Sequence, residues 1–191
     1  MHLTRRSIWI VLVVGIVVFT STRSPAAEPT TADAPKGSAP SLEWLREAII
    51  RRGVTGRLVR IEKLPEDATN PAAGAGRIVF WTKTKRITQT VVIAVVANDA
   101  YVRIQSCDLA TVRKDHPRFA DFMAYALDRN FAMSGVQFAR DANDGEVVLR
   151  SDVPCANGVI EEDFVQVLEA VVRAADDESP RLWALVGRPG E

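Results

Sequence analysis

The sequence VVIAVVANDAYVRIQ at residues 91–105 indicates two neighbouring strands of an antiparallel sheet. Its first seven residues are all apolar and mostly β-branched, which is typical of a strand at the centre of a sheet. The Asn-Asp pair that follows favours a turn. Beyond this turn, apolar residues alternate with Tyr101, Arg103 and Gln105, so the second strand has one face on the core and one mixed polar and aromatic face.

Further elements are predicted before this pair of strands. Residues 78–82 favour a strand, and residues 56–64 alternate in part and indicate another. Residues 42–52 carry apolar positions at helical spacing, behind Ser41, whose side chain can cap a helix. Residues 65–76 contain two prolines, two glycines and several alanines, which predict an irregular loop.

A helix, a hairpin and a last helix are predicted after the strands. The first of these helices begins near Pro117, and we expect its regularly spaced apolar residues to be buried: Phe119, Phe122, Met123, Ala126 and Leu127. Residues 136–140 and 146–150 flank Asp144 and Gly145, which favour a tight hairpin. The predicted buried stripe of the last helix is Phe164, Leu168, Val171, Val172 and Ala175. The order of helix, three strands, helix, hairpin and helix predicts an α+β fold with helices packed on one face of a curved antiparallel sheet.

Residues 78 to about 182 resemble the YbjN-like family, which is related in fold to the type III secretion chaperones. The resemblance rests on the apolar helix leading to Asn130 and Phe131, the run of Gly135, Val136, Gln137, Phe138 and Asp141, the hairpin at Gly145, and the closing helix at Phe164 with Asp176 and Pro180 after it. It implies an α+β domain without a known catalytic centre. Members that look like this are regulators, or chaperones that bind extended protein segments, often as dimers. The N-terminal signal described next and the loop at residues 65–76 are departures from the family pattern.

The N-terminus has the pattern of a secretory signal. Arg5 and Arg6 precede an apolar run of 12 residues, which is shorter than the roughly 20 residues that span a bilayer. Ser24 and Ala26 favour cleavage after Ala26, and an uncleaved membrane anchor is the alternative. We therefore expect a protein exported to the periplasm or the cell exterior, with a signal at residues 1–26, a disordered linker at 27–40, one domain at 41–186 and a tail at 187–191.

The charge balance argues against a nucleic-acid partner. The whole chain has 24 basic and 24 acidic residues, and removal of residues 1–26 leaves 21 basic against the same 24 acidic ones. A mildly acidic domain is a poor match for the phosphate backbone. We predict no nucleic-acid binding, and contact with a membrane only through an uncleaved N-terminus.

The sequence offers little material for catalysis or metal binding. His116 is the only histidine after the signal, so a metal site built on several histidines is excluded, and Cys107 with His116 is the sharpest pair for a thiol enzyme. We expect His116 to have a local role at the start of a helix. The acids at 161–163 and 176–178 occupy consecutive helical positions, which point in different directions, so we expect solvated faces. The prediction is a protein that is not an enzyme and has no cofactor and no metal.

Two cysteines remain to be placed. Cys107 and Cys155 each follow or end a predicted strand, in a chain expected in an oxidising compartment. One interpretation is a disulfide between them, and the other is two buried, reduced thiols.

Trp81, Tyr101 and Arg103 are the candidate partner-binding residues, because these residue types dominate protein interfaces. The first hypothesis is a non-enzymatic, exported binding module, chaperone-like or regulatory, which recognises a segment of an unidentified protein partner or forms a homodimer through its sheet. The alternative is a small-molecule sensor with a pocket between the sheet and the first helix. For residues 182–186, a partner-binding segment and a docked tail are both open.

Overall fold

The computed structural model describes residues 39–54, 59–62, 76–96 and 100–188 of the chain. Their elements, in order, are α1 (Leu42–Arg51), β1 (Val59–Glu62), β2 (Arg77–Lys83), β3 (Thr88–Val96), β4 (Tyr101–Thr111), α2 (Phe119–Ala132), β5 (Gln137–Arg140), β6 (Glu146–Pro154) and α3 (Glu161–Val186). None of the helices in these ranges is long and apolar enough to cross a membrane. Almost all of the predicted signal, linker and long loop lies outside the described residues.

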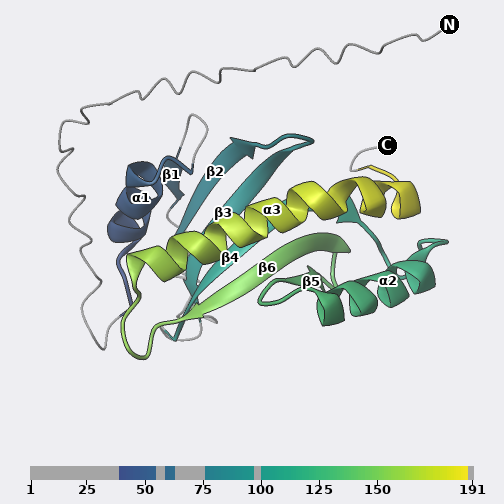
Figure 1. The fold of residues 1–191 in the computed structure, drawn as a ribbon. Coiled ribbons are helices and arrows are strands. Elements are labelled where there is room, and N and C mark those ends of the chain that lie inside the picture. Colours follow the sequence, from purple (N-terminus) through teal and green to yellow (C-terminus); the bar gives the residue numbers. More distant parts are fainter. Residues whose placement is uncertain (1–38, 55–58, 63–75, 97–99, 189–191) are drawn as a thin grey trace, which may run out of the picture. The chain divides into compact units, whose positions relative to one another are not determined.

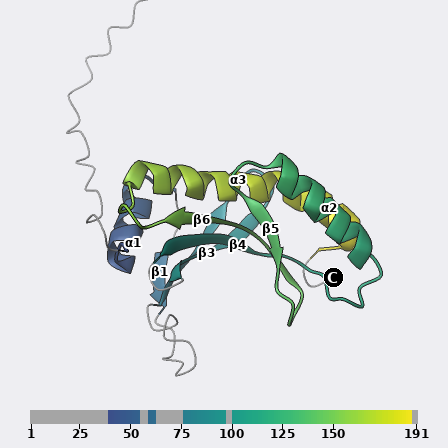
Figure 2. The ribbon, with the colours of Figure 1, turned by 90° about the horizontal axis from the view of Figure 1, so that it is seen from below.

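The strands form one antiparallel sheet in the order β1-β2-β3-β4-β6-β5. The helices lie on one face of this sheet, as Figure 1 and Figure 2 show. Helix α3 packs on β4 and β6, α1 on β1 and β2, and α2 on β5. The predicted α+β fold class is confirmed, and the partly alternating segment before the long loop does contribute a strand, β1.

The core lies between the helices and the sheet. Alternate residues of the central strands point into it, and among them Phe80 and Ile104 are completely buried. Two buried polar side chains are satisfied there: Ser106 donates a hydrogen bond to Gln89 at 2.6 Å, and Gln89 donates one to the carbonyl of Val172 on α3 at 3.1 Å. These bonds join the sheet to α3 without leaving an unpaired group.

Helix α3 is longer than the sequence pattern predicts. It continues through Pro180 to Val186, so residues 182–186 are docked on the domain, as one of the two interpretations predicts, but as the last turns of α3 and not as a tail. Proline removes one backbone hydrogen bond, but the turn beyond it is held by packing and by a side-chain bond. Leu182 is completely buried, and the indole of Trp183 donates to the carbonyl of Leu109 at 2.7 Å.

Helix α2 is rotated relative to the prediction. Phe122 and Ala126 are buried as expected and Phe119 is partly buried, but Met123 and Leu127 are 47% and 70% exposed. The reason is that α2 lies at the end of the helical layer, where it packs mainly on β5 and α3 (Figure 2). Two of the five residues of the predicted stripe, Met123 and Leu127, therefore face away from the core.

The connection between β5 and β6 is a five-residue loop at 141–145 and not the tight hairpin that was predicted. Gly145 has a φ of 85°, which is the left-handed geometry expected of it. The loop is held against the end of β4, because the carbonyl of Gly145 accepts a hydrogen bond from the backbone N–H of Val112 at 2.8 Å. This tertiary contact, which local sequence does not encode, favours the longer loop.

Candidate functional site: the open face of the sheet

The face of the sheet opposite the helices carries no helix among the described residues (Figure 2). Trp81 on β2 and Tyr101 on β4 point to this face and are 43% and 41% exposed. Trp81 pairs with Thr90 of β3, and Tyr101 pairs with Val96 of the same strand. Because these two β3 residues are six positions apart and a strand rises about 3.3 Å per residue, the two aromatic residues lie about 20 Å apart along the strand direction.

Between the two aromatic residues, β3 shows only short side chains on this face. They are Thr90, Val92, Ala94 and Val96, and all four are partly buried. Strand β3 thus lies inside the sheet, as predicted, but only the residues that point to the core are buried. Along β3, the open face is therefore formed by short and mostly apolar side chains, with an aromatic side chain of a neighbouring strand near each end.

Arg103, the third predicted binding residue, is on this face but already has a partner. Its guanidinium donates two hydrogen bonds to the carboxylate of Asp152 on β6, at 2.8 and 2.9 Å. The hydrogen bonds from Arg103 lower the pKa of Asp152 below its ordinary value, and those to Asp152 raise the pKa of Arg103. Both side chains of the pair are therefore ionised. The charge of Arg103 is neutralised by Asp152, and its guanidinium is held in place beside the open face.

The predicted disulfide between Cys107 and Cys155 is not compatible with this fold. Cys155 follows β6 and its backbone N–H bonds to the carbonyl of Ala100, next to the start of β4, whereas Cys107 lies six residues further along β4 from Tyr101. At about 3.3 Å per residue this is about 20 Å, and a disulfide needs Cα atoms within roughly 7 Å. Cys155 lies beside the start of β4, and Cys107 lies in the second half of that strand.

The structure gives no support to a thiol nucleophile at Cys107. Burial, followed by the charges of Glu146 and Asp108, raises the pKa of this thiol to about 12, so it is protonated at neutral pH. The Nδ1 atom of His116 accepts a hydrogen bond from the backbone N–H of Arg118 at 3.1 Å. His116 has the local role at the start of α2 that the sequence predicts.

The expectation of solvated faces is wrong for three of the six acids, because Glu161, Asp176 and Glu178 are buried. Glu161 is buried and accepts hydrogen bonds from Arg51 at 2.7 Å and Arg52 at 3.4 Å. Glu178 is also buried and accepts from Arg129 at 2.5 Å. No group of three or more potential metal ligands occurs in the part of the chain that the structure describes.

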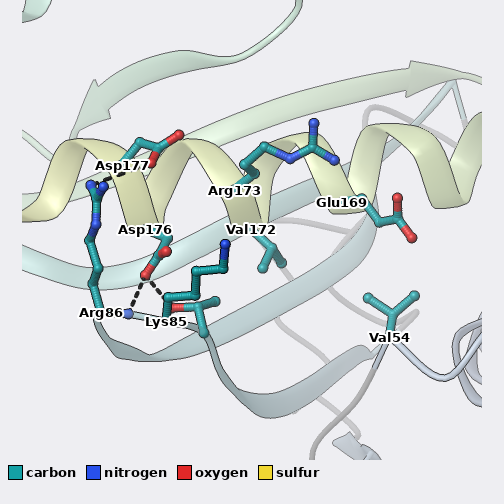
Figure 3. Close-up of a pocket in the computed structure, with 9 residues that line it drawn as sticks. Val54, Lys85, Arg86, Glu169, Val172, Arg173, Asp176 and Asp177 are labelled. Atoms are coloured by element: carbon teal, nitrogen blue, oxygen red, sulfur yellow. Dashed lines mark hydrogen bonds and ion pairs between the residues drawn. The ribbon is translucent and has the colours of Figure 1, made fainter. Parts of the chain in front are cut away.

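A pocket of about 480 Å³ lies between α3, the β2–β3 turn and Val54, which follows α1. It is not between the sheet and the first helix, where the alternative hypothesis predicted one. Figure 3 shows Asp176 pointing to the turn, where it accepts hydrogen bonds from the side chain of Thr84 and, at 2.9 Å, from the backbone of Arg86. Lys85, Glu169 and Arg173 also line the pocket, without an ion-pair partner among the described residues.

A second exposed apolar surface lies on α2, where the sequence pattern had predicted core. It consists of Met123, Leu127 and Phe131, the last of which is 97% exposed. The four-residue spacing of these side chains is visible in the sequence, but the side of the helix that meets the core is not.

The described residues form an α+β domain whose sheet has an open face with two exposed aromatic side chains. No protein-family model matches the sequence, and no curated protein matches it. Among solved structures, YbjN from E. coli is similar at 15% identity and a TM-score of 0.46, over 75% of this chain and 94% of that chain.

One chain of the heterodimeric complex ExoU-SpcU, from the type III secretion system of Pseudomonas aeruginosa, is similar at 16% identity and a TM-score of 0.42. That similarity covers 74% of this chain and 97% of the other. The family that the sequence pattern resembles is thus also found among the similar structures. These similarities concern the fold, and the function of this domain has to be inferred from its own surfaces.

Proposed function

We propose that this domain is an exported, non-enzymatic binding module that holds an extended segment of a partner protein against the open face of its sheet. The observation that carries the proposal is the exposure of Trp81 and Tyr101 on a face that no described helix covers. Large aromatic side chains are the usual anchors of protein interfaces, because they bury much apolar area at a small cost in conformational entropy.

The dimensions of the face favour an extended segment. The separation of about 20 Å between the two aromatic residues corresponds to about six residues of an extended chain. The short side chains of β3 let a backbone approach the sheet closely. Arg103 and Arg77 at this face are paired with Asp152 and Glu62, whereas Lys83 and Arg150 have no ion-pair partner among the described residues, so the expected segment is apolar and not basic.

The test is capture of the partner from the cell's own envelope with a C-terminally tagged full chain, after mild cross-linking, with identification by mass spectrometry. We expect a reproducible partner whose recovery falls at least about tenfold on Trp81→Ala or Tyr101→Ala, as for interface anchors. Ile160→Ala is the matched control, because Ile160 is also an exposed apolar residue but lies in the connection before α3. Equal recovery with all three variants would contradict the proposal.

Export is part of the proposal and rests on Arg5, Arg6 and the apolar run after them. The mass of the intact chain isolated from the envelope tests it. Loss of residues 1–26 is the expected result, and an intact N-terminus in a membrane fraction would indicate the anchored alternative.

A small-molecule sensor remains a second candidate because of the pocket beside the β2–β3 turn. Its volume is within the usual range for ligand sites, and Lys85, Glu169 and Arg173 converge there without ion-pair partners among the described residues. Thermal unfolding of the purified chain with a library of charged metabolites tests this function. Stabilisation that disappears in Arg173→Ala would favour it, and no stabilisation by any compound would count against it.

A further inference from the structure

We propose that Arg150, with Gln105 and Gln137 on either side of it, binds a carboxylate on the open face of the sheet, and that this carboxylate is an aspartate or glutamate side chain of the bound segment. The inference rests on the proposed function and adds to it the charged group that the segment carries. It starts from a charge on this face that has no counter-ion among the described residues.

The side chain of Arg150 is partly buried without a partner. Its Nε atom is shielded from solvent and donates no hydrogen bond to any described residue. In the ranges that the structure describes, it is the only buried side-chain nitrogen or oxygen atom of which this is true. Taking a guanidinium out of water without an acceptor or a counter-ion costs free energy, and such groups are rare in folded proteins. A carboxylate bound to the guanidinium offsets this cost.

The other two arginines in the middle of this face already have carboxylates. Arg77 pairs with Glu62 at 2.8 Å. Asp152 lies two residues from Arg150 on β6, but its two carboxylate oxygens accept from the Nε and Nη2 atoms of Arg103. The described part of the sheet therefore supplies a carboxylate to two arginines and none to Arg150.

The register of the sheet places two amide side chains directly beside Arg150. Gln105 of β4 is opposite it on one side, and Gln137 of β5 is opposite it on the other. The alternation of each strand turns all three side chains to the open face. Residues directly opposite in an antiparallel pair have Cβ atoms about 4.5–5.5 Å apart, so the three polar groups can converge on one small ligand. None of the three side chains has a hydrogen bond to a described residue.

The chemistry of this row of residues selects a carboxylate. A guanidinium presents paired N–H donors that match the two oxygens of a carboxylate, and the amide groups can donate to the remaining lone pairs. A hollow of about 310 Å³, lined by Arg150 and Gln137, leaves room for the group. Asn130 and Asp152 also line this hollow, but both are engaged, Asn130 with the backbone of β5 and Asp152 with Arg103.

The position of the row indicates which carboxylate it binds. The row continues on β3 with Val92, which lies two residues, about 7 Å, from the partner of Trp81 and four residues, about 13 Å, from the partner of Tyr101. A segment that contacts both aromatic residues therefore passes the row in its interior, where it can offer a side-chain carboxylate but not its C-terminus. Arg150 is two strands away from β3, about 10 Å, a gap that an arginine and an acidic side chain bridge together.

Selection from a random library of ten-residue peptides on the full chain, purified in the processed form that cells accumulate, tests the proposal. The wild-type chain should select apolar peptides that carry an aspartate or glutamate at a constant position relative to the apolar residues. Arg150→Gln should select apolar peptides without this acid. Lys83→Gln is the matched control, because it removes an unpaired positive charge from the same face but outside the row, and it should still select the acid.

The outcomes separate this proposal from the proposed function. Wild-type peptides that depend on Trp81 but carry no acid would overturn the role of Arg150 and leave the aromatic anchors intact. A wild-type chain that selects no peptide, or selection that Trp81→Ala does not weaken, would overturn both.

A double-mutant cycle with one selected peptide measures the contact itself. Replacing the acid of the peptide by its amide should weaken binding about tenfold with the wild-type chain and less than about twofold with Arg150→Gln. Equal losses with both chains would contradict the contact. Amidation of the C-terminus of the peptide should change the affinity less than about twofold, and a larger loss would overturn the assignment to a side chain.

Thermal unfolding of the variants tests whether Arg150 is needed for the fold instead. Arg150→Gln removes a charge that has no counter-ion, so it should unfold at the wild-type temperature or above it. Arg103→Gln leaves Asp152 without its partner and should unfold at a lower temperature. A marked fall for Arg150→Gln would assign this residue to the stability of the sheet and overturn the proposal.

Discussion

Gly145 lies where the loop between β5 and β6 touches the end of β4, and two separate constraints act on it. Its φ is 85°, and a Cβ atom there would be 2.8 Å from the backbone nitrogen of Arg113. Gly135 is a matched comparison, because its φ is 75° but nothing lies within 4 Å of a Cβ atom. We expect Gly145→Ala to lower the free energy of unfolding by about 2–4 kcal/mol and Gly135→Ala by about 1 kcal/mol. Urea denaturation measures both, and equal losses would show that the close approach costs nothing.

Single residues also show where sequence reasoning stops. Asn130 and Phe138 belong to the pattern that resembles the YbjN-like family, but their roles become clear only in three dimensions. The Asn130 amide donates to the carbonyl of Phe138 at 3.1 Å and accepts from its backbone N–H at 2.5 Å. One side chain thereby joins the end of α2 to β5. The spacing of residues in the sequence does not predict these hydrogen bonds, because the position of Phe138 relative to Asn130 depends on how β5 pairs with β6.

At the scale of elements, the contact between α1 and α3 depends on the buried carboxylate of Glu161. The hydrogen bond from Arg51 keeps the pKa of Glu161 below its ordinary value of 4.5, although burial works against this. A carboxylate with a lowered pKa in the folded state stabilises it above the ordinary pKa, and this contribution is lost as the pH falls through the folded value.

We expect Glu161→Gln to lower the free energy of unfolding by about 1–3 kcal/mol at pH 7, because a charge-assisted hydrogen bond to a buried group is weakened. The difference from wild type should shrink below about pH 4. Glu162→Gln is the control, since Glu162 pairs with Arg52 at 2.7 Å but is 55% exposed in its side chain, and its substitution should cost under about 0.5 kcal/mol. A difference at Glu161 that does not change with pH would contradict the role of its charge.

The elements themselves were largely predictable, but the rotation of α2 was not. The alternation in β4 and the helical spacing in α1 and α3 follow from local periodicity. In α2, however, Phe122 with Ala126 and Met123 with Leu127 are two apolar pairs at the same four-residue spacing, about 100° apart around the helix. Periodicity cannot distinguish which pair faces the sheet. That choice is made by contacts with Phe138 and Glu178, far away in the sequence.

At the scale of the whole molecule, the placement of the two cysteines makes stability independent of redox conditions. Cys107 and Cys155 lie toward opposite ends of β4, so no intramolecular bond can form without unfolding the sheet. We expect the thermal unfolding temperature to be the same, within error, with and without a reducing agent. Calorimetry of the purified chain measures this, and a fall on reduction would show that the thiols are bonded after all. From sequence, an even number of cysteines could not settle this, because the separation depends on which strands are neighbours.

The two edge strands of the sheet are short, and its inner strands are long. In the part of the chain that the structure describes, both outer strands, β1 and β5, have four residues, whereas the strands between them have seven to eleven. An outer strand exposes unpaired backbone groups that can recruit further strands, and a short one offers few of them. Among the described residues, the sheet therefore offers little edge along which copies could stack without limit. We expect the domain to have a low tendency to grow into fibres at high concentration.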